Sequence, residues 1–275
     1  MKKHLSLLLF TLLIFSLLLA NPPYSTLNEK TYIFQPCLSN NISIMRNNDY
    51  SSIEQPLTVS SGFKTDGSQP SDERGLLKFD ISSLPKGFKV KLAKLYLYVI
   101  GVYVWNGNEW TPKLALARTI QIHRITTDWI GWSFTYWSYA AFPSKLWNTP
   151  GGDFLPATDS VNFEITGTWN AWIVTSDVEA WYKGEHPNYG WLIKDLNEGD
   201  KIGYRVEYNN WFYVFGVEYS PKLEIILIIE ANFLIKPLLM MSIFFSLFNH
   251  PNIRFKLNSI YLNEKNFKVN IYSIS

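Results

Sequence analysis

The chain has 275 residues, a formal net charge of +2 and 17% charged residues, a length that allows a sizeable core and a composition too apolar for a disordered protein. The positive excess comes from the two ends, because residues 24–230 carry 18 Lys and Arg against 22 Asp and Glu, a net charge of −4. A mildly acidic body lacks the basic surface that binds phosphate backbones, so nucleic-acid binding is excluded.

The first predicted element is an export signal. Lys2 and Lys3 precede an apolar run that begins at Leu5 and ends at Ala20, the order found in secretory signal peptides. An uncleaved membrane anchor is the alternative, since the run is close to the minimum length of a membrane span. Both interpretations predict an exported protein, secreted or held at the cell surface. Cys37 is the one cysteine and has no partner within the chain, so this domain must be stabilised by its core alone.

After a linker at residues 21–30, the chain is predicted to form short strands. In KLAKLYLYV, residues 91–99, the odd positions from Ala93 to Val99 are all apolar, while the even positions carry Lys94, Tyr96 and Tyr98. A period of two with one apolar face indicates a half-buried strand. The preceding Pro85-Lys86-Gly87 predicts a turn. The complete set of expected strands is 31–34, 57–59, 75–81, 90–103, 114–126, 161–165, 190–194, 204–206, 211–218 and 222–229.

One short helix is expected in TSDVEAWYKG, residues 175–184. Ser176 and Glu179 have the spacing of a capping box, Val178 and Trp181 belong to an apolar side, and Gly184 can end the helix. About ten strands with a single helix predict an all-β sandwich of the jelly-roll type over residues 31–230.

The composition changes at residue 231. The apolar run ANFLIKPLLMMSIFFSLF is interrupted by Lys236 and Pro237, and the piece from Leu238 to Phe248 is too short to span a bilayer alone. Residues 231–275 are therefore interpreted as an irregular tail outside the sandwich, either membrane-associated or not a native domain.

Several motifs occur in a recognisable order over residues 31–228. They are RGLLKFDISSLPKGFKVKLAKLYLYV, IHRITTDWIGWSFTYWS, LWNTPGGDF, SDVEAWYKGEHPNYGWLIKD and YSPKLEIIL. Together they resemble DNRLRE-type domains, the carbohydrate-binding-module-like β-sandwiches of exported bacterial and archaeal proteins. The chain departs from that pattern in two places. Tyr136 stands where the family has a Trp, and the segment NNDYSSIEQPLTV matches the family's usual Asn-x-Gly motif only weakly. The resemblance implies a jelly-roll fold, an extracellular setting and polysaccharide binding; some members accompany polysaccharide lyases, and some archaeal members belong to surface proteins.

The abundant aromatic residues, 16% of the chain, provide the candidate ligand site. Aromatic faces stack on the apolar C–H faces of sugar rings, but aromatic side chains also fill many β-sandwich cores. Trp129 and Tyr136 occupy motif positions and are expected in the core. The candidates for an exposed sugar-binding surface, which break the strand alternation or flank a turn, are Trp105, Trp110, Trp132, Trp137 and Tyr139.

Charged residues suggest two further contacts. Arg118, Arg124 and Lys145 could pair with the carboxylate of an acidic sugar, although a solvated strand face is the preferred interpretation. Gly151-Gly152-Asp153, assisted by Asp159, could hold a structural Ca²⁺ ion. A tight turn in which Asp153 binds its own backbone is preferred there.

No catalytic site is predicted. The four His stand at positions 4, 123, 186 and 250, and no zinc-binding pattern, Ser-His-Asp spacing or phosphate loop appears. The first hypothesis, which rests on the resemblance to DNRLRE-type domains and on the abundant aromatic residues, is an exported, non-catalytic module that binds polysaccharide. The second is a structural surface protein that binds its own copies or another protein, with EIILIIE at residues 224–230 available for strand addition. The third is a lyase-like enzyme on the same scaffold, for which the sequence nominates no residues.

Overall fold

The computed structural model describes residues 29–36, 40–46, 50–52, 57–62, 70–200, 202–210, 216–229, 260–263 and 266–269. The predicted signal segment, most of the linker and most of the tail lie outside the described residues. Among the described residues, no helix combines the length and apolar character needed to cross a membrane. The chain forms two compact units, Met1–Ile228 and Ile229–Ser275.

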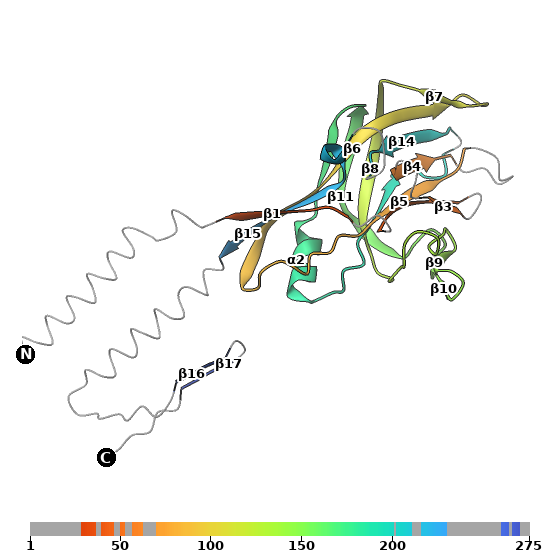
Figure 1. Cartoon of the computed structure of the whole chain (residues 1–275). Coiled ribbons are helices and arrows are strands. Elements are labelled where there is room, and N and C mark those ends of the chain that lie inside the picture. The colour runs from red at the N-terminus through yellow and green to blue at the C-terminus, as the bar shows by residue number, and fades with distance from the viewer. Residues whose placement is uncertain are drawn as a thin grey trace, which may run out of the picture. The chain divides into compact units, whose positions relative to one another are not determined.

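The first unit is an all-β sandwich, as predicted (Figure 1). One layer, sheet I, consists in order of β1 (Lys30–Phe34), β15 (Lys222–Ile229), the first half of β6 (Phe88–Trp105) and β12 (Trp169–Ile173). The other layer, sheet II, continues from the second half of β6 through β14 (Tyr204–Tyr208), β4 (Leu57–Ser61), β5 (Glu73–Leu77), β13 (Trp191–Asp195), β8 (Ala115–Ile125) and β11 (Phe154–Ile165). Shorter strands extend sheet II, namely β2 (Asn41–Met45) beside β5, β3 (Tyr50–Ser52) beside β2, and β7 (Trp110–Pro112) beside β6.

Strand β6 belongs to both layers. Its residues Lys94 to Tyr98 pair with β12, whereas its residues Val99 to Val104 pair with β14. The pairing with β14 shifts register between Glu207 and Tyr208, and such an irregularity bends a strand and increases its twist. One long strand thereby joins the two layers along one side.

The core between the layers follows the predicted alternation. Every odd-numbered side chain from Ala93 to Val99 is completely buried. Ile120 and Ile122 of β8 and Trp191 of β13 face them from sheet II, and each large apolar side chain contributes about 1.5–3 kcal/mol when it is fully buried. The indole N–H of Trp172, in β12, donates to the carbonyl of Ile120 at 3.1 Å, and this hydrogen bond joins sheet I to sheet II.

The predicted helix is present as α2 (Thr175–Lys183), with Val178 and Trp181 buried and Gly184 closing it at φ 74°. The predicted capping box is wrong, because the N-cap is Val174 and no side chain caps the helix. The helix follows β12 directly, and the Val174 N–H donates to Ala93 O at 2.9 Å. The Thr175 hydroxyl accepts from Ala93 N at 3.0 Å instead of capping, so contact with β6 decides where the helix begins.

Most expected strands are confirmed, with shifted ends in β5 and β11. Residues 217–218, expected to end a strand, belong instead to the 3₁₀ helix η3 (Val217–Tyr219), which follows Gly216 at φ 90°; residues 211–215 lie outside the described residues. The strands that the sequence did not predict are β2, β3, β7, β12, β9 (Tyr139–Ala141) and β10 (Lys145–Leu146). Strand β2 resembles a loop in composition because Asn41 and Ser43 are polar, yet both are buried.

Among its described residues, the second unit contains the antiparallel pair of β16 (Ile260–Asn263) and β17 (Asn266–Val269). The prediction of an irregular tail did not include this pair.

Candidate carbohydrate-binding surface

Residues 126–153, between β8 and β11, form a lobe on the outer face of sheet II that contains β9 and β10. Three tryptophans of this lobe, Trp129, Trp137 and Trp147, are buried against side chains that point away from the main core. Leu76 and Leu192 are two of those side chains. The lobe and the outer face of the sheet therefore enclose a second, smaller core.

Hydrogen bonds to backbone groups hold the lobe in place. The Trp129 indole donates to Tyr189 O at 2.7 Å, and the Trp147 indole donates to Tyr136 O at 2.9 Å. The buried Thr135 hydroxyl accepts from Gly131 N and donates to Ala140 O. Because these two indole N–H groups are satisfied, Trp129 and Trp147 are buried without the cost of an unpaired donor.

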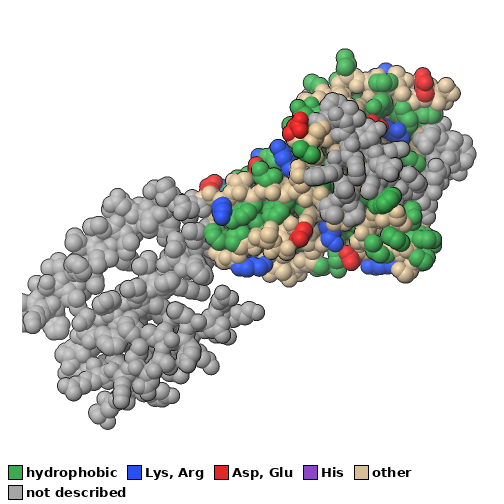
Figure 2. Space-filling view, in the orientation of Figure 1, with side chains coloured by type: hydrophobic (Ala, Val, Ile, Leu, Met, Phe, Trp, Pro, Cys, Tyr) green, Lys and Arg blue, Asp and Glu red, His purple; other side chains and the backbone are tan. Residues whose placement is uncertain are grey.

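The lobe presents three large aromatic side chains to solvent. Trp132 is 45% exposed, Phe134 48% and Phe142 45%, and Figure 2 shows hydrophobic side chains gathered at the lower right, over β9 and β10. Tyr136 and Tyr139 are half-buried and pack edge-to-face on Phe142, with ring centroids 5.6 Å and 5.1 Å apart. The ring of Phe142 is nearly perpendicular to those of Tyr136 and Tyr139, at 88° and 82°. These three rings therefore do not form a coplanar row.

We call Trp132, Phe134, Tyr139 and Phe142 the lobe aromatics. Trp132 and Tyr139 were singled out from the sequence as exposed candidates, whereas Phe134 and Phe142 of the same aromatic-rich stretch were not. The turn residues beside them, Gly131 and Pro143, were the available signal, because side chains next to tight turns tend to reach solvent.

The prediction that Trp137 is exposed is wrong. Trp137 is 7% exposed, and the guanidinium groups of Arg74 and Arg46 lie 4.6 Å and 5.9 Å from its ring centroid. Gly151 packs against it so closely that an added Cβ would lie 2.8 Å from the Trp137 ring. Arginine stacking on an aromatic face contributes to packing. The contact between Trp137 of the lobe and Arg74 of β5 therefore stabilises the packing of the lobe on sheet II.

Trp105 and Trp110 lie in the β6–β7 hairpin, outside the lobe, and both are half-buried. Their rings pack edge-to-face at 5.3 Å, and the Arg205 guanidinium lies 4.4 Å from the Trp110 centroid. Arg205 also pairs with the buried Glu73 at 2.9 Å. Burial raises the pKa of Glu73, although the charge of Arg205 opposes that shift. Trp110 therefore shields an ion pair, and it exposes less ring than Trp132 does.

Arg118 is buried and paired, which contradicts both its proposed contact with a sugar carboxylate and the solvated strand face. Its Nε and Nη2 donate to the two carboxylate oxygens of Asp195 at 2.8 Å and 2.7 Å. Nη2 also donates to Ser61 at 3.1 Å. Lys145 is exposed and donates to the carbonyl of Asp128 at 3.0 Å. Arg124 is 17% exposed in its side chain and pairs with Asp177 at 3.8 Å. Lys145 is thus the most accessible of the three basic candidates.

Asp153 adopts the preferred turn geometry. It accepts from the Thr127 hydroxyl at 2.7 Å and from the backbone N–H groups of Asn148 and Thr149 at 3.0 Å and 2.9 Å. Burial opposes its ionisation, but these hydrogen bonds hold its pKa below the ordinary value. Asp159 accepts from Ile173 N in β12 at 2.6 Å. In the described part of the chain, no three acidic, His or Cys side chains cluster as metal ligands.

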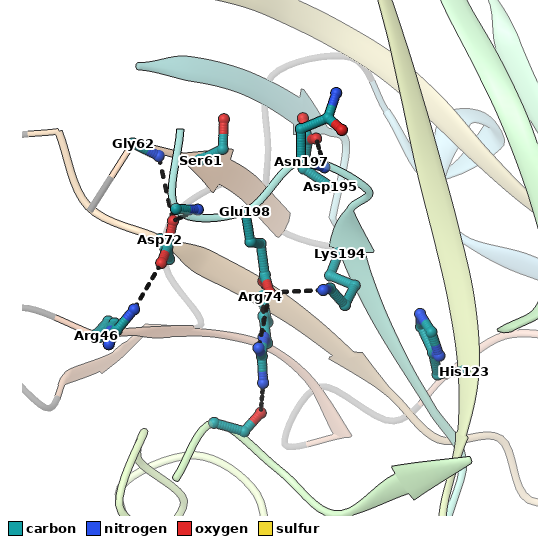
Figure 3. Close-up of polar contacts among 12 residues, drawn as sticks. Arg46, Ser61, Gly62, Asp72, Arg74, His123, Lys194, Asp195, Asn197 and Glu198 are labelled. Carbon is teal, nitrogen blue, oxygen red and sulfur yellow. Dashed lines mark hydrogen bonds and ion pairs between the residues drawn. The ribbon is translucent and has the colours of Figure 1, made fainter. Parts of the chain in front are cut away.

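A polar cluster lies beside the lobe on sheet II (Figure 3). Arg74 pairs with Glu198 and donates to Gly151 O at 2.7 Å, while Lys194 reaches the same carboxylate at 2.7 Å. Arg46 pairs with Asp72 at 3.0 Å. These mutually paired charges connect β5, β13 and the lobe, so their geometry favours a structural role.

His123 lies next to this cluster in Figure 3. Its Nδ1–H donates to Leu155 O at 2.8 Å, since a carbonyl can only accept. Burial lowers its pKa, and its Nε2 is buried with no hydrogen-bond partner among the residues that the structure describes. The imidazole is therefore neutral near pH 7.

The chain was also compared with known proteins. No model of a known protein family matches the chain, and no curated protein matches it.

Proposed function

We propose that this chain is an exported, non-catalytic protein that binds polysaccharide through the lobe aromatics. The observation that carries the proposal is the contrast within the lobe, where three buried tryptophans secure the backbone while Trp132, Phe134 and Phe142 stand about half exposed. The motif series that resembles DNRLRE-type domains supports the same function. The predicted signal segment supports export.

The physical basis is stacking on a surface that is already ordered. An aromatic ring offers a large apolar face with few rotatable bonds, so a sugar ring that covers it gains burial at little cost in side-chain entropy. The indole hydrogen bonds of Trp129 and Trp147 reduce the ordering that binding would otherwise require. Lys145 and Asp128, which is 57% exposed in its side chain, offer polar groups near the rings for orienting hydroxyls.

The test is binding of the purified full chain to an array of immobilised neutral and acidic polysaccharides, with a chelator arm. Trp132→Ala and Phe142→Ala should each weaken binding roughly tenfold or more, because burial of a large apolar side chain is worth about 1.5–3 kcal/mol. Leu114→Ala is the matched control, since Leu114 is 88% exposed but lies outside the lobe. Unchanged binding by both lobe variants, or no binding by a folded wild-type chain, would contradict the proposal.

A second candidate function is assembly with other copies at the surface. Ile130 and Leu146 are 55% and 61% exposed on the same lobe, and aliphatic side chains do not stack on sugars but bury well between proteins. The prediction that EIILIIE is available for strand addition is wrong for its described residues, because β15 already pairs with β1 on one side and with β6 on the other. Strand addition at β12 is not favoured either, because Asp159 already satisfies the N–H of Ile173. Concentration-dependent association in sedimentation, abolished by Leu146→Lys, would support assembly; a monomer at all concentrations would contradict it.

A further inference from the structure

A second group of aromatic side chains lies on the outer face of sheet I. Tyr96 and Tyr98 of β6, Trp169 of β12 and Tyr219 of η3 are all half-buried. Trp169 and Tyr98 are direct partners across the two strands. The alternating residues of the same strands fill the core, so these rings point to the opposite side, away from it.

Ring contacts fix the arrangement of this group. Tyr98 and Trp169 pack edge-to-face with centroids 5.2 Å apart. Tyr219 lies 4.4 Å from Tyr98 and is nearly parallel to Trp169, at 24° and 6.3 Å. Mutual packing holds each ring in one orientation, which lowers the entropy that a ligand must overcome.

Charged groups border these rings. The Lys222 ammonium lies 4.4 Å from the Trp169 centroid and 5.0 Å from that of Tyr96. Among the described residues Lys222 forms no ion pair, so its donors remain available to a ligand. The Tyr96 hydroxyl donates to Glu224 at 3.4 Å, which places a carboxylate acceptor beside the same rings. A donor and an acceptor next to aromatic faces match the paired hydroxyls of a sugar ring.

We propose that Tyr96, Tyr98, Trp169, Tyr219 and Lys222 form a second sugar-binding site, the sheet I site, and that the protein bridges two polysaccharide chains. The inference rests on the proposed function of the lobe. The lobe covers the outer face of sheet II, whereas the sheet I site occupies the outer face of the opposite layer. One sugar ring cannot contact both sites, so each site holds its own segment of glycan.

Bridging changes what the protein does to its ligand. A chain with one site coats a polysaccharide, while a chain with two sites on opposite faces links separate strands and is retained on a network through its combined affinity. The sequence separates the two sites as well, since the lobe lies between β8 and β11 and the sheet I site is assembled from β6, β12, η3 and β15.

The test is titration calorimetry of the full chain with cellohexaose, mannohexaose, xylohexaose and a galacturonate hexamer, followed by light scattering with the parent polysaccharide. The wild type should bind about two hexamers per chain, and Trp169→Ala or Trp132→Ala should each reduce this to about one. Both variants should lose the increase in scattering while still binding the polysaccharide. Ile173→Ala, which removes an exposed side chain from the same face of β12, should change neither reading.

Lys222→Met provides a second variant that keeps the side-chain stem and removes the charge. It should weaken the sheet I site about tenfold even if Trp169→Ala does not fold. Two results would contradict the sheet I site while leaving the lobe function intact. One is binding of one hexamer per wild-type chain, and the other is an undiminished increase in light scattering with folded Trp169→Ala. No binding of any hexamer or polysaccharide would overturn both.

Discussion

Arg74 and Glu198 form a two-pronged ion pair although 124 positions separate them in the sequence. The Arg74 Nε and Nη2 atoms each lie 2.7 Å from one carboxylate oxygen of Glu198. Both side chains are nearly buried, at 12% and 11% exposure. Burial alone would raise the pKa of Glu198, but Arg74 and Lys194 hold it below the ordinary value.

Removal of Arg74 should destabilise the sandwich. Arg74→Ala leaves Glu198 with Lys194 alone and frees the Gly151 carbonyl, so we expect the free energy of unfolding to fall by about 3–5 kcal/mol. Denaturant unfolding followed by tryptophan fluorescence measures it. Lys183→Ala is the control, because the exposed Lys183–Glu179 pair within α2 should contribute only about 0.3–0.5 kcal/mol. Equal losses for the two variants would contradict the structural role of Arg74.

Gly190 should tolerate no side chain. Its φ is +78°, and an added Cβ would lie 2.9 Å from Lys78 Cα and closer still to the Leu77 carbonyl. Gly190→Ala should therefore lower the free energy of unfolding by more than the roughly 1–2 kcal/mol of a left-handed alanine alone. Gly87→Ala isolates that conformational cost, since Gly87 has φ +87° with no atom within 4 Å. The prediction fails if thermal unfolding shifts equally in both variants.

Stability should decline in mild acid through His123. Burial lowers its folded-state pKa, with the charges of Lys194 and Arg74 acting in the same direction. The unfolded chain protonates near pH 6.5. The folded state resists the proton, so the stability present above that pH is lost as the pH falls, by at most about 1.4 kcal/mol per pH unit.

The check is the pH dependence of unfolding between about pH 7 and pH 5. His123→Gln should flatten the slope, because glutamine can still donate to Leu155 O but does not titrate. A slope that persists in His123→Gln would assign the acid sensitivity to another group.

Asp153 should contribute stability that disappears at lower pH. Its folded pKa lies below the ordinary value, so its contribution is complete above about pH 4 and is lost as the pH falls through the folded pKa. Asp153→Asn should cost about 1–3 kcal/mol at neutral pH, and this difference from wild type should vanish in strong acid. A chelator should not lower the wild-type melting temperature; a clear drop would instead favour the calcium interpretation.

The sequence predicted those elements whose side chains alternate or repeat without interruption. The core face of β6 was recognised because burial on one face imposes a period of two, and β15 was recognised as an apolar run that follows the turn signal Ser220-Pro221. Strand β2 was missed because Asn41 and Ser43, which look like loop residues, become buried only when β2 pairs with β5. Its pattern depends on a neighbour more than thirty positions away rather than on adjacent residues.

Local sequence patterns could not predict which individual aromatic side chains are exposed to solvent. Trp132 and Trp137 stand five positions apart in one motif, yet Trp132 is exposed and Trp137 is covered by Arg74. Arg118 was assigned to solvent because its partner, Asp195, lies 77 positions further along the chain. Both errors have the same origin, since the residues that bury these side chains come from distant strands.

The sequence by itself determined that residues 31–230 build an all-β sandwich that includes the helix α2, because alternation and turn residues act over a few neighbouring positions. Only the tertiary structure decided which aromatic rings face solvent and which charges are neutralised. Packing of the lobe on sheet II and of η3 on sheet I brings together residues far apart in the chain, and burial depends on that packing rather than on local sequence.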